Sequence, residues 1–433
     1  ETNTTSIKNK VVFLSLKLPG ILNFEFFIAK RIIRSKDYKS SISAPIIKIA
    51  ITAIALGMIM MLVSIATGVG LQQKVREKVS AFNGDIIISH FDTNFSNDSQ
   101  NPISINQPFY PVFEDIPEIK HIQITALKGG IIRTETDFEG VVVKGVGDDY
   151  NWQYFEEFLR EGRLPVYEET LNDEILLSEF ITNRLNLKIG DKVITYFFDE
   201  ESKERPLRPR GFTLVGIYNS GFQEFDESYL IADIRHIQRL NRWEADQIGA
   251  FELFVTDFDK IQETGNKVYY NVDSTLDTQT IRDKYFSIFE WLDLFDFNIA
   301  LIIGIMILVA GINMITALLV LILERTKMIG ILKSLGSSNL SIRKVFIYNA
   351  VYLIGIGLFW GNLIGIGLLL AQKYFKLFPL NPDTYYVTEA PVYLDLGYIL
   401  ILNAGTFLLC LLMLLIPSYI ITKISPVKAI RFE

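Results

Sequence analysis

Four long runs of apolar residues dominate the hydrophobic pattern of the chain. They are Ile46–Val69, Ile299–Leu323, Val345–Leu370 and Leu396–Ile421. Each reaches the roughly 20 residues that a helix needs to cross the hydrocarbon core of a bilayer. The first run has Lys48 as its one charged residue, at its start, and the second and fourth have none. The pattern predicts four transmembrane helices at these positions.

Residues 70–298, between the first and second runs, show a different pattern. Short stretches rich in β-branched and aromatic residues predict strands at Asp85–Ser89, Gly140–Lys144, Lys192–Phe198, Phe212–Tyr218 and Phe251–Val255. Helical spacing predicts helices at Glu179–Leu185, Ile234–Leu240 and Thr280–Phe289. The polar segment 91–108 predicts a loop. This part of the chain therefore has the pattern of an α+β domain without internal repeats.

Charge follows the same division. Residues 70–298 carry 23 Lys/Arg and 41 Asp/Glu, whereas the rest of the chain is net basic. The basic connections predict, by the positive-inside rule, that residues 1–45, 324–344 and 422–433 are cytoplasmic and that 371–395 is not. The acidic block is then extracytoplasmic. The sequence thus predicts an α-helical membrane protein with four transmembrane helices and an inserted extracytoplasmic α+β domain.

Three local patterns add to this picture. Asn23–Arg34 has apolar residues near helical spacing and several bases, which predicts an amphipathic helix on the cytoplasmic membrane surface. Gly357, Gly361 and Gly365 stand four residues apart in the third run, which predicts close helix packing within the bundle or against a partner subunit. The segment Asp199–Gly211 is charged, contains two prolines and lies between two predicted strands, so it is either an exposed loop or a protruding arm.

The methionines of the first run also allow two interpretations. They are either lipid-facing filler or an adaptable lining for a lipid substrate, because methionine packs against irregular shapes. On the second interpretation, the candidate walls of a lipid-substrate cavity come from the first and second spans: Met58, Met61, Leu62, Ile65, Ile302 and Ile305.

Enzyme signatures are absent from the sequence. It contains no GxxxxGK[ST] phosphate-binding loop and no GxSxG motif. The three histidines have no metal-ligand spacing, and Cys410 is the one cysteine, inside an apolar run. The acidic balance of residues 70–298 argues against nucleic acid as a partner. These features favour a transporter, a channel or a tethered sensor over an enzyme.

Two segments resemble signatures of FtsX/MacB-type ABC transporter permeases. They are ERTKMIGILKSLGSS (Glu324–Ser338), followed by Ile342 and Phe346, and SPVKAIRFE (Ser425–Glu433). Three further stretches resemble the lipoprotein-releasing (LolC/LolE) branch of that family: Phe27–Arg34, Gly216–Leu230 and Asp383–Leu394. The resemblance implies that residues 324–344 form a cytoplasmic coupling helix that contacts an ATPase.

The residues themselves agree with such a role. Ile329, Ile331, Leu332 and Leu335 form an apolar stripe at helical spacing beside basic residues, and a short amphipathic helix can dock into a groove on a partner. The alternative is a helix that lies on the bilayer. The residues expected to couple to the ATPase are Glu324, Arg325, Lys327, Ile329, Ile331, Leu332, Lys333, Leu335 and Gly336. Met328 departs from the family pattern, in which many relatives have Glu at that position.

The resemblance also implies partners and a location. They are a cytoplasmic ABC ATPase dimer that binds ATP and Mg, a second permease subunit (the same chain or a paralogue), a lipoprotein cargo, a periplasmic lipoprotein carrier and membrane lipid, at the bacterial inner membrane. The chain itself is expected to bind no cofactor. The carrier would be bound by the arm, with Pro206, Leu207, Arg208, Pro209 and Arg210 as candidates. The competing functions are MacB-like export or efflux and FtsX-like signalling to a cell-wall hydrolase.

Overall fold

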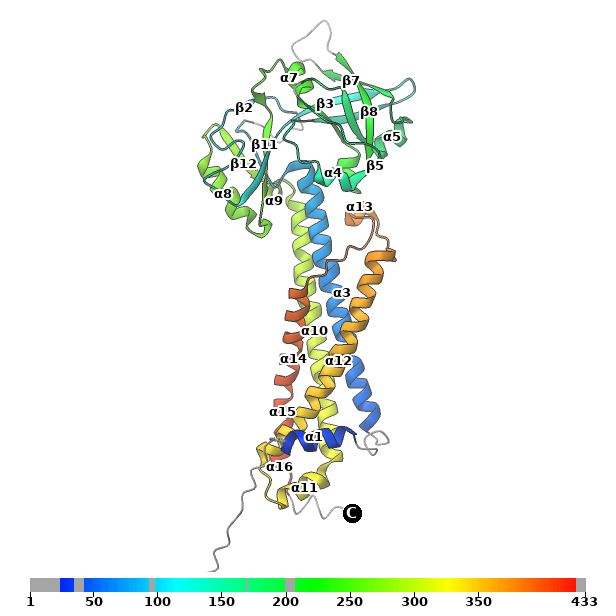
Figure 1. Ribbon diagram of the computed structural model, residues 1–433, viewed down its shortest axis with the longest axis vertical. Helices are drawn as coiled ribbons and strands as arrows, with labels where there is room; N and C mark the ends of the chain where they lie inside the picture. The colour runs from blue at the N-terminus through cyan, green and yellow to red at the C-terminus, as the bar shows by residue number, and fades with distance from the viewer. Residues whose placement is uncertain (1–23, 35–42, 93–97, 169, 199–206, 426–433) are drawn as a thin grey trace, which may run out of the picture. The chain divides into compact units, whose positions relative to one another are not determined.

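The computed structural model describes residues 24–34, 43–92, 98–168, 170–198 and 207–425 (Figure 1). These residues pack into two compact units. The bundle unit comprises the described parts of Glu1–Val63, Leu301–Gly367 and Asp395–Glu433, and the sheet unit comprises those of Ser64–Ala300 and Leu368–Leu394.

Four helices among the described residues are long and apolar enough to cross a membrane. They are α3 (Ser43–Asn83), α10 (Phe286–Glu324), α12 (Asn339–Phe375) and α14 (Leu396–Met413), which continues through α15 (Leu415–Ser418) and α16 (Ile420–Lys423). Two shorter helices, α1 (Phe24–Arg34) and α11 (Thr326–Ser334), belong to the bundle unit. Each predicted apolar run lies within one of the four long helical stretches.

The predicted helix Thr280–Phe289 is wrong as one element. The structure has α9 (Ile281–Lys284), followed by the start of α10 at Phe286. Thr280 caps α9 by accepting a hydrogen bond from the Asp283 N–H, and Tyr285 leaves the helical region with φ −110° and ψ 43°. The cap and this bend separate the two helices.

The glycine ladder of α12 faces α3. A Cβ placed on Gly361 would lie 2.6 Å from the Cβ of Met58, and one on Gly357 would lie 2.7 Å from Ile54. A Cβ on Gly365 would lie 3.0 Å from Leu62. The helix backbones approach this closely because these positions lack side chains, which confirms close packing within the chain.

A pair of asparagines joins α12 to α14. The Asn362 amide donates to the Asn403 side-chain oxygen at 2.7 Å, and the Asn403 amide donates back at 3.0 Å. Each amide uses its second N–H on a backbone carbonyl one turn earlier, Leu358 or Ile399. Both amide groups therefore have partners for their donors in an apolar setting, where an unpaired polar group is costly.

A mixed ten-stranded sheet forms the centre of the sheet unit. Its strands are β1 (Ile86–His90), β3 (Ile119–Arg133), β4 (Phe138–Val146), β5 (Leu159–Gly162), β6 (Glu174–Ser178), β7 (Lys192–Phe198), β8 (Leu207–Tyr218), β9 (Tyr229–Asp233), β11 (Ala250–Val255) and β12 (Leu276–Thr280). The order is β12-β1-β11-β3-β4-β9-β6-β8-β5, with β7 pairing to β3 and β8. The β4–β9 and β6–β8 pairs are parallel and the other described pairs are antiparallel.

Short helices connect these strands: α4 (Gln153–Phe158), α5 (Glu179–Leu185), α6 (Gln223–Asp226), α7 (Ile234–Asn241) and α8 (Ile261–Asn271). One more short helix, α13 (Pro382–Tyr385), lies in the connection between α12 and α14. All five predicted strands and the helices at α5 and α7 are present, which confirms an α+β domain. The predicted loop 91–108 is wrong in one detail, because β2 (Ile103–Ser104) pairs there with β10 (Gln247–Ile248).

The prolines of Asp199–Gly211 also behave differently from the prediction. The structure extends β8 back to Leu207, and Pro209 takes a place in the ladder with β7. A proline is tolerated where its nitrogen faces no second strand. β6, which also flanks β8, pairs with it only from Thr213 onward. Residues 199–206, including Pro206, lie outside the described residues.

The glycine ladder gives a matched test. Gly361→Leu is expected to destabilise the protein by about 1–3 kcal/mol, because the added side chain must displace α3. Gly355→Leu on the same helix is the control, since a Cβ there meets nothing within 4 Å. Thermal unfolding in detergent measures both variants. Equal melting temperatures for the two would contradict the close α3–α12 contact.

Candidate functional site

The apolar residues predicted to form one stripe on α11 lie on two different faces of the helix. Ile329 is fully buried, whereas Ile331 is 52% and Leu335 78% exposed. Ile331 and Leu335 stand four residues apart and so share one face of the helix. Gly336 ends the helix with φ +91°, a conformation that glycine adopts freely. The other predicted coupling residues around this face are exposed or half-buried: Glu324, Arg325, Lys327 and Leu332.

Lys333 turns away from that exposed face. Its Nζ donates to the backbone carbonyls of Ile421 and Ile424, both at 2.7 Å. Burial lowers the pKa of Lys333. The guanidinium of Arg343 on α12 similarly donates to the Ser418 hydroxyl at 3.1–3.2 Å. Lys333 therefore holds the end of α16, whereas Lys327 is exposed.

Met328, the departure from the family pattern, packs inside the bundle unit. It is half-buried against a cluster that contains Ala29 and Ile32 of α1. The Ser341 hydroxyl of α12 donates to Glu25 of α1 at 2.7 Å, and this bond lowers the pKa of Glu25. Helix α1 thus contacts both α11 and α12. Aromatic residues of α1 that stay exposed are Phe24, Phe26 and Phe27.

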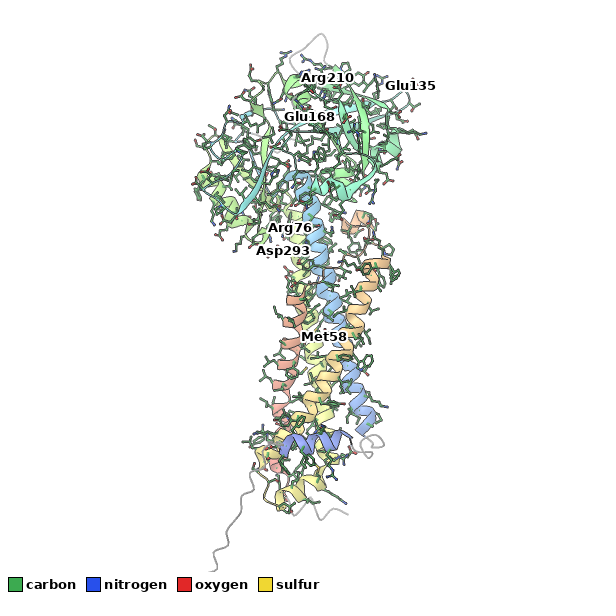
Figure 2. All side chains as sticks on the ribbon, viewed as in Figure 1. Met58, Arg76, Glu135, Glu168, Arg210 and Asp293 are labelled. Atoms are coloured by element: carbon green, nitrogen blue, oxygen red, sulfur yellow. The ribbon has the colours of Figure 1, made fainter. Side chains whose placement is uncertain are left out.

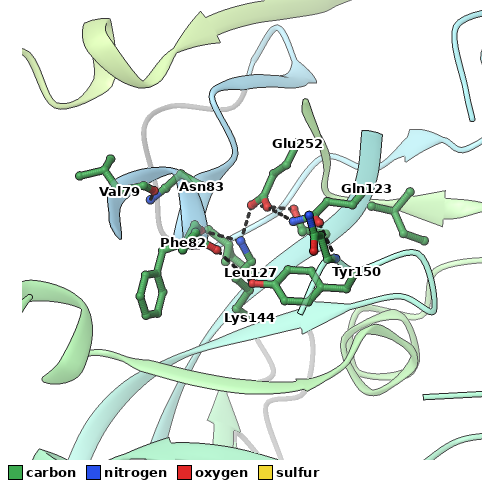
Figure 3. A network of polar contacts seen from close by, with 12 residues as sticks. Val79, Phe82, Asn83, Gln123, Leu127, Lys144, Tyr150 and Glu252 are labelled. Carbon is green, nitrogen blue, oxygen red and sulfur yellow. Dashed lines mark hydrogen bonds and ion pairs between the residues drawn. The ribbon is translucent and has the colours of Figure 1, made fainter. Parts of the chain in front are cut away.

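In the sheet unit, the last turn of α3 ends on a buried polar network (Figure 3). Lys144 of β4 is fully buried, and its Nζ donates to the Phe82 carbonyl at 2.5 Å and forms an ion pair with Glu252 of β11. Glu252 also accepts a hydrogen bond from Gln123 at 2.8 Å. The Tyr150 hydroxyl donates to the Ala81 carbonyl at 3.1 Å. Burial lowers the pKa of Lys144, and the Glu252 carboxylate opposes that shift.

The start of α10 is fastened to the same helix end. Lys284 Nζ and the Tyr285 hydroxyl donate to the side-chain oxygen of Asn83, at 3.0 and 3.1 Å. Burial lowers the pKa of Lys284 to about 8. About three turns further along each helix, the Gln72 amide of α3 donates to Asp296 of α10 at 2.9 Å. The two helices are therefore tied to each other where they enter the sheet unit.

A chain of aromatic rings continues from this point. Phe82 stacks on Phe225 with 4.6 Å between ring centroids, and Phe225 stacks on Phe222 at the same distance. Phe222 stacks on Tyr386 at 4.7 Å, and Tyr386 meets Trp291 of α10 at 5.7 Å. The rings join the end of α3, the segment Gly216–Leu230, the connection between α12 and α14, and α10. We call this set of contacts the aromatic junction.

The aromatic junction brings together two segments that carry the family resemblance, Gly216–Leu230 and Asp383–Leu394. In the first, Asp226 accepts hydrogen bonds from the Ser220 hydroxyl at 2.7 Å and the Gly221 N–H at 2.9 Å. Burial raises the pKa of Asp226, while these bonds act in the opposite direction. No local sequence pattern predicts that these two segments touch.

The residues predicted to wall a lipid cavity do not share one surface. Met58 and Met61 are fully buried, and Met58 lies among the helices of the bundle unit, as labelled in Figure 2. Leu62 is also buried, Ile302 is half-buried and Ile305 is 49% exposed. Ile65 is half-buried and belongs to the sheet unit. The cavity stays a prediction.

Of the predicted arm, the structure describes Leu207, Arg208, Pro209 and Arg210, all in β8 (Figure 2 labels Arg210). Leu207 lines a cavity of about 400 Å³ together with Phe138 and Phe198. These three side chains are 44%, 72% and 57% exposed. The base of the arm therefore carries an exposed apolar surface, which the charged sequence of Asp199–Gly211 did not predict.

Comparisons with known proteins agree with this architecture. A family model described as MacB-like periplasmic core domain matches residues 49–284, and one described as FtsX-like permease C-terminal matches residues 300–426. The second description is that of a membrane permease, and the two matches together span the mixed-sheet domain and the four membrane-length helices of the described residues. The chain belongs to the FtsX/MacB family of ABC transporter permeases.

Several curated relatives match nearly the whole length of the chain. The lipoprotein-releasing system transmembrane protein LolC of Neisseria meningitidis is 22% identical, over 95% of this chain and 100% of that protein. The corresponding LolE of Haemophilus influenzae is 22% identical, over 94% and 99%. Among solved structures, the periplasmic region of MacB from Actinobacillus actinomycetemcomitans is 14% identical, with a TM-score of 0.32, and covers 47% of this chain and 91% of that chain.

The aromatic junction can be tested by a double-mutant cycle. Phe222→Leu and Tyr386→Leu are expected to be non-additive by about 0.5–1.5 kcal/mol in unfolding free energy, because each removes one ring of a stacked pair. A second cycle of Phe222→Leu with Tyr270→Leu is the control, since Tyr270 is 83% exposed. Additive effects in the first cycle would show that the stack carries no energy.

Proposed function

We propose that the chain is the permease subunit of an ABC transporter that extracts lipoproteins from the inner membrane and passes them to a periplasmic carrier. The observation that carries this proposal is the similarity, over nearly the full length of both chains, to proteins named lipoprotein-releasing system transmembrane proteins. Burying or exposing an acyl chain involves about 0.8 kcal/mol per CH₂ group. Extraction of an acylated protein therefore needs an energy source, which a separate ATPase, with its own ATP and Mg, would supply.

Helix α11 is the proposed contact with that cytoplasmic ATPase dimer. Its exposed pair, Ile331 and Leu335, offers an apolar face of the kind that docks in a groove. The opposite side is held by the buried Ile329 and by Lys333. This orientation supports Ile331, Leu335 and Lys327 as contact residues, while the Lys333 ammonium is bonded to the end of α16. Both chain termini would share the cytoplasmic side with α11.

The base of the arm is the proposed carrier contact, on the extracytoplasmic side. Phe138, Phe198 and Leu207 are exposed there around one cavity. Exposed apolar surface of this kind marks contact sites for proteins or lipids. A carrier that shields acyl chains must itself present apolar surface, so the two would match in chemistry. A second permease subunit, either the same chain or a paralogue, would complete the walls of the lipid cavity in the membrane.

MacB-like export is the second candidate, because the family model over residues 49–284 carries that name. An FtsX-like signalling permease is the third. Neither requires acylated cargo. The fate of lipoproteins therefore separates both from the main proposal.

If α11 is the ATPase contact, charged substitutions on its exposed face should prevent ATPase binding. Ile331→Asp combined with Leu335→Asp should abolish co-purification of the ATPase, because two carboxylates cannot be desolvated in an apolar groove without cost. Val112→Asp is the control, since Val112 is 64% exposed in the sheet unit. Affinity purification from membranes that contain equal amounts of each variant measures the effect. Undiminished ATPase recovery from the double variant would exclude α11 as the contact.

Depletion tests the cargo. When the chain is depleted in its native bacterium, acylated proteins of the outer membrane should accumulate in the inner-membrane fraction. Membrane fractionation and immunoblotting measure their distribution, and outer-membrane proteins without acyl chains serve as the control. Normal delivery of lipoproteins after depletion would refute lipoprotein release and favour export or signalling.

A further inference from the structure

A cleft of about 520 Å³ in the sheet unit has a basic lining that neither the fold nor the proposed function explains. It lies between α3, the segments 157–160 and 219–221, and the connection 387–393. Five of its lining residues are basic: Lys74, Lys78, Arg160, Lys373 and Lys376. Three are acidic: Glu77, Glu157 and Glu389. The excess of basic residues in the cleft contrasts with the net negative charge of residues 70–298, to which most of the cleft belongs.

The acidic residues of this basic cleft are already paired. Lys74 Nζ lies 3.1 Å from Glu77 and 3.0 Å from Glu157, and Lys376 Nζ lies 3.0 Å from Glu389. The three carboxylates are thus balanced by two of the five cations. The remaining cations, Lys78, Arg160 and Lys373, dominate the charge that an incoming group would meet.

Among these three cations, Lys78 lies at the closed end of the cleft. It is 9% exposed, and its Nζ donates a single hydrogen bond, to the Tyr386 carbonyl at 3.0 Å, although an ammonium has three N–H donors. Asp226, the carboxylate whose charge favours the Lys78 ammonium most, is itself bonded to Ser220 and Gly221. A buried cation with one neutral acceptor is favourable only when further acceptors reach it.

Arg160 and Lys373 stand at the open side of the cleft. Both are exposed, and neither forms a hydrogen bond or ion pair with any residue in the described part of the chain. The wall beside them is rigidly built. The Gln372 side chain donates to the Ala390 carbonyl and accepts from the Phe378 N–H, both at 3.0 Å. Three cations therefore converge on a preformed cleft, an arrangement suited to an anionic group.

The position along the helices indicates where that group comes from. Lys74 lies five residues beyond Val69, or about 7 Å along α3, and Lys373 lies three residues beyond Leu370. Lipid headgroups occupy a layer of about 5–7 Å on each side of the hydrocarbon core. Exposed aromatic residues, which favour this interfacial layer, follow Lys373 directly: Tyr374, Phe375 and Phe378. The open side of the cleft is therefore at headgroup depth.

We propose that this cleft binds the phosphodiester headgroup of an anionic phospholipid from the leaflet that faces the sheet unit. Arg160 and Lys373 engage the phosphate, Lys78 supplies donors at the closed end, and the acyl chains stay in the bilayer beside Tyr374 and Phe375. A bound lipid would link α3 to the connection between α12 and α14. This inference concerns a lipid site and does not depend on which cargo the permease carries.

The test is lipid binding to the purified, delipidated full chain in detergent, measured by native mass spectrometry with added phosphatidylglycerol. The double variant Arg160→Glu/Lys373→Glu should lower the affinity about tenfold, because two charge-assisted contacts become repulsive. Lys188→Glu/Lys192→Glu is the control, with the same change of charge at two exposed positions of the sheet unit outside the cleft. Equal melting temperatures without lipid will show that both variants are folded.

Two further ligands identify the chemistry. Diacylglycerol has the acyl chains without phosphate, and glycerophosphate has the phosphate without the chains. Weak binding of both supports the proposal. Unchanged phosphatidylglycerol binding by the Arg160→Glu/Lys373→Glu variant would overturn it. Diacylglycerol that binds as tightly as phosphatidylglycerol would also overturn it, because the phosphate would then contribute nothing to binding. Glycerophosphate that binds as tightly as phosphatidylglycerol would overturn it as well, because the acyl chains would then contribute nothing.

Discussion

The end of α3 is buried in the sheet unit, and the ion pair of Lys144 with Glu252 makes that burial possible. The last carbonyls of a helix lack intrahelical partners and carry the negative end of the helix dipole. Lys144 and Tyr150 supply donors to two of these carbonyls, at Phe82 and Ala81. A lone buried ammonium would cost several kcal/mol, and Glu252 offsets that cost. The membrane helix can therefore end within the sheet unit and not beneath it.

The same part of the sheet unit also fixes the beginning of α10. Helices α3 and α10 are uninterrupted from Ser43 to Asn83 and from Phe286 to Glu324, and each contributes residues to both compact units. Asn83 ties one helix to the start of the other. The aromatic junction then adds the connection between α12 and α14. Within the sheet unit, the ends of both helices are therefore held by side-chain contacts as well as by backbone continuity.

The sequence predicts the parts that depend on local patterns. Apolar runs of membrane length identify the four long helices, and β-branched stretches identify strands such as β7 and β8. Pairing of distant segments has no such local signal. Lys144 and Glu252 each have a local signal, because each is the charged residue of a predicted strand that is otherwise apolar. Nothing in the sequence pairs these two residues with each other. The contact of Phe222 with Tyr386 joins residues more than 160 positions apart, and only the folded chain reveals it.

Helix α11 shows how structure changes the interpretation of a sequence motif. The sequence treats Ile329, Lys333 and Leu335 as one contact surface, yet only Leu335 faces outward. Lys333 holds the carbonyls that end α16, and Met328 packs against α1. Helix α11 is therefore joined to α1 and α12 through the cluster around Met328 and to α16 through Lys333, by contacts inside the bundle unit. Several helices thus fix its orientation, because the connection to α10, which precedes it in the chain, is one of several contacts that it makes.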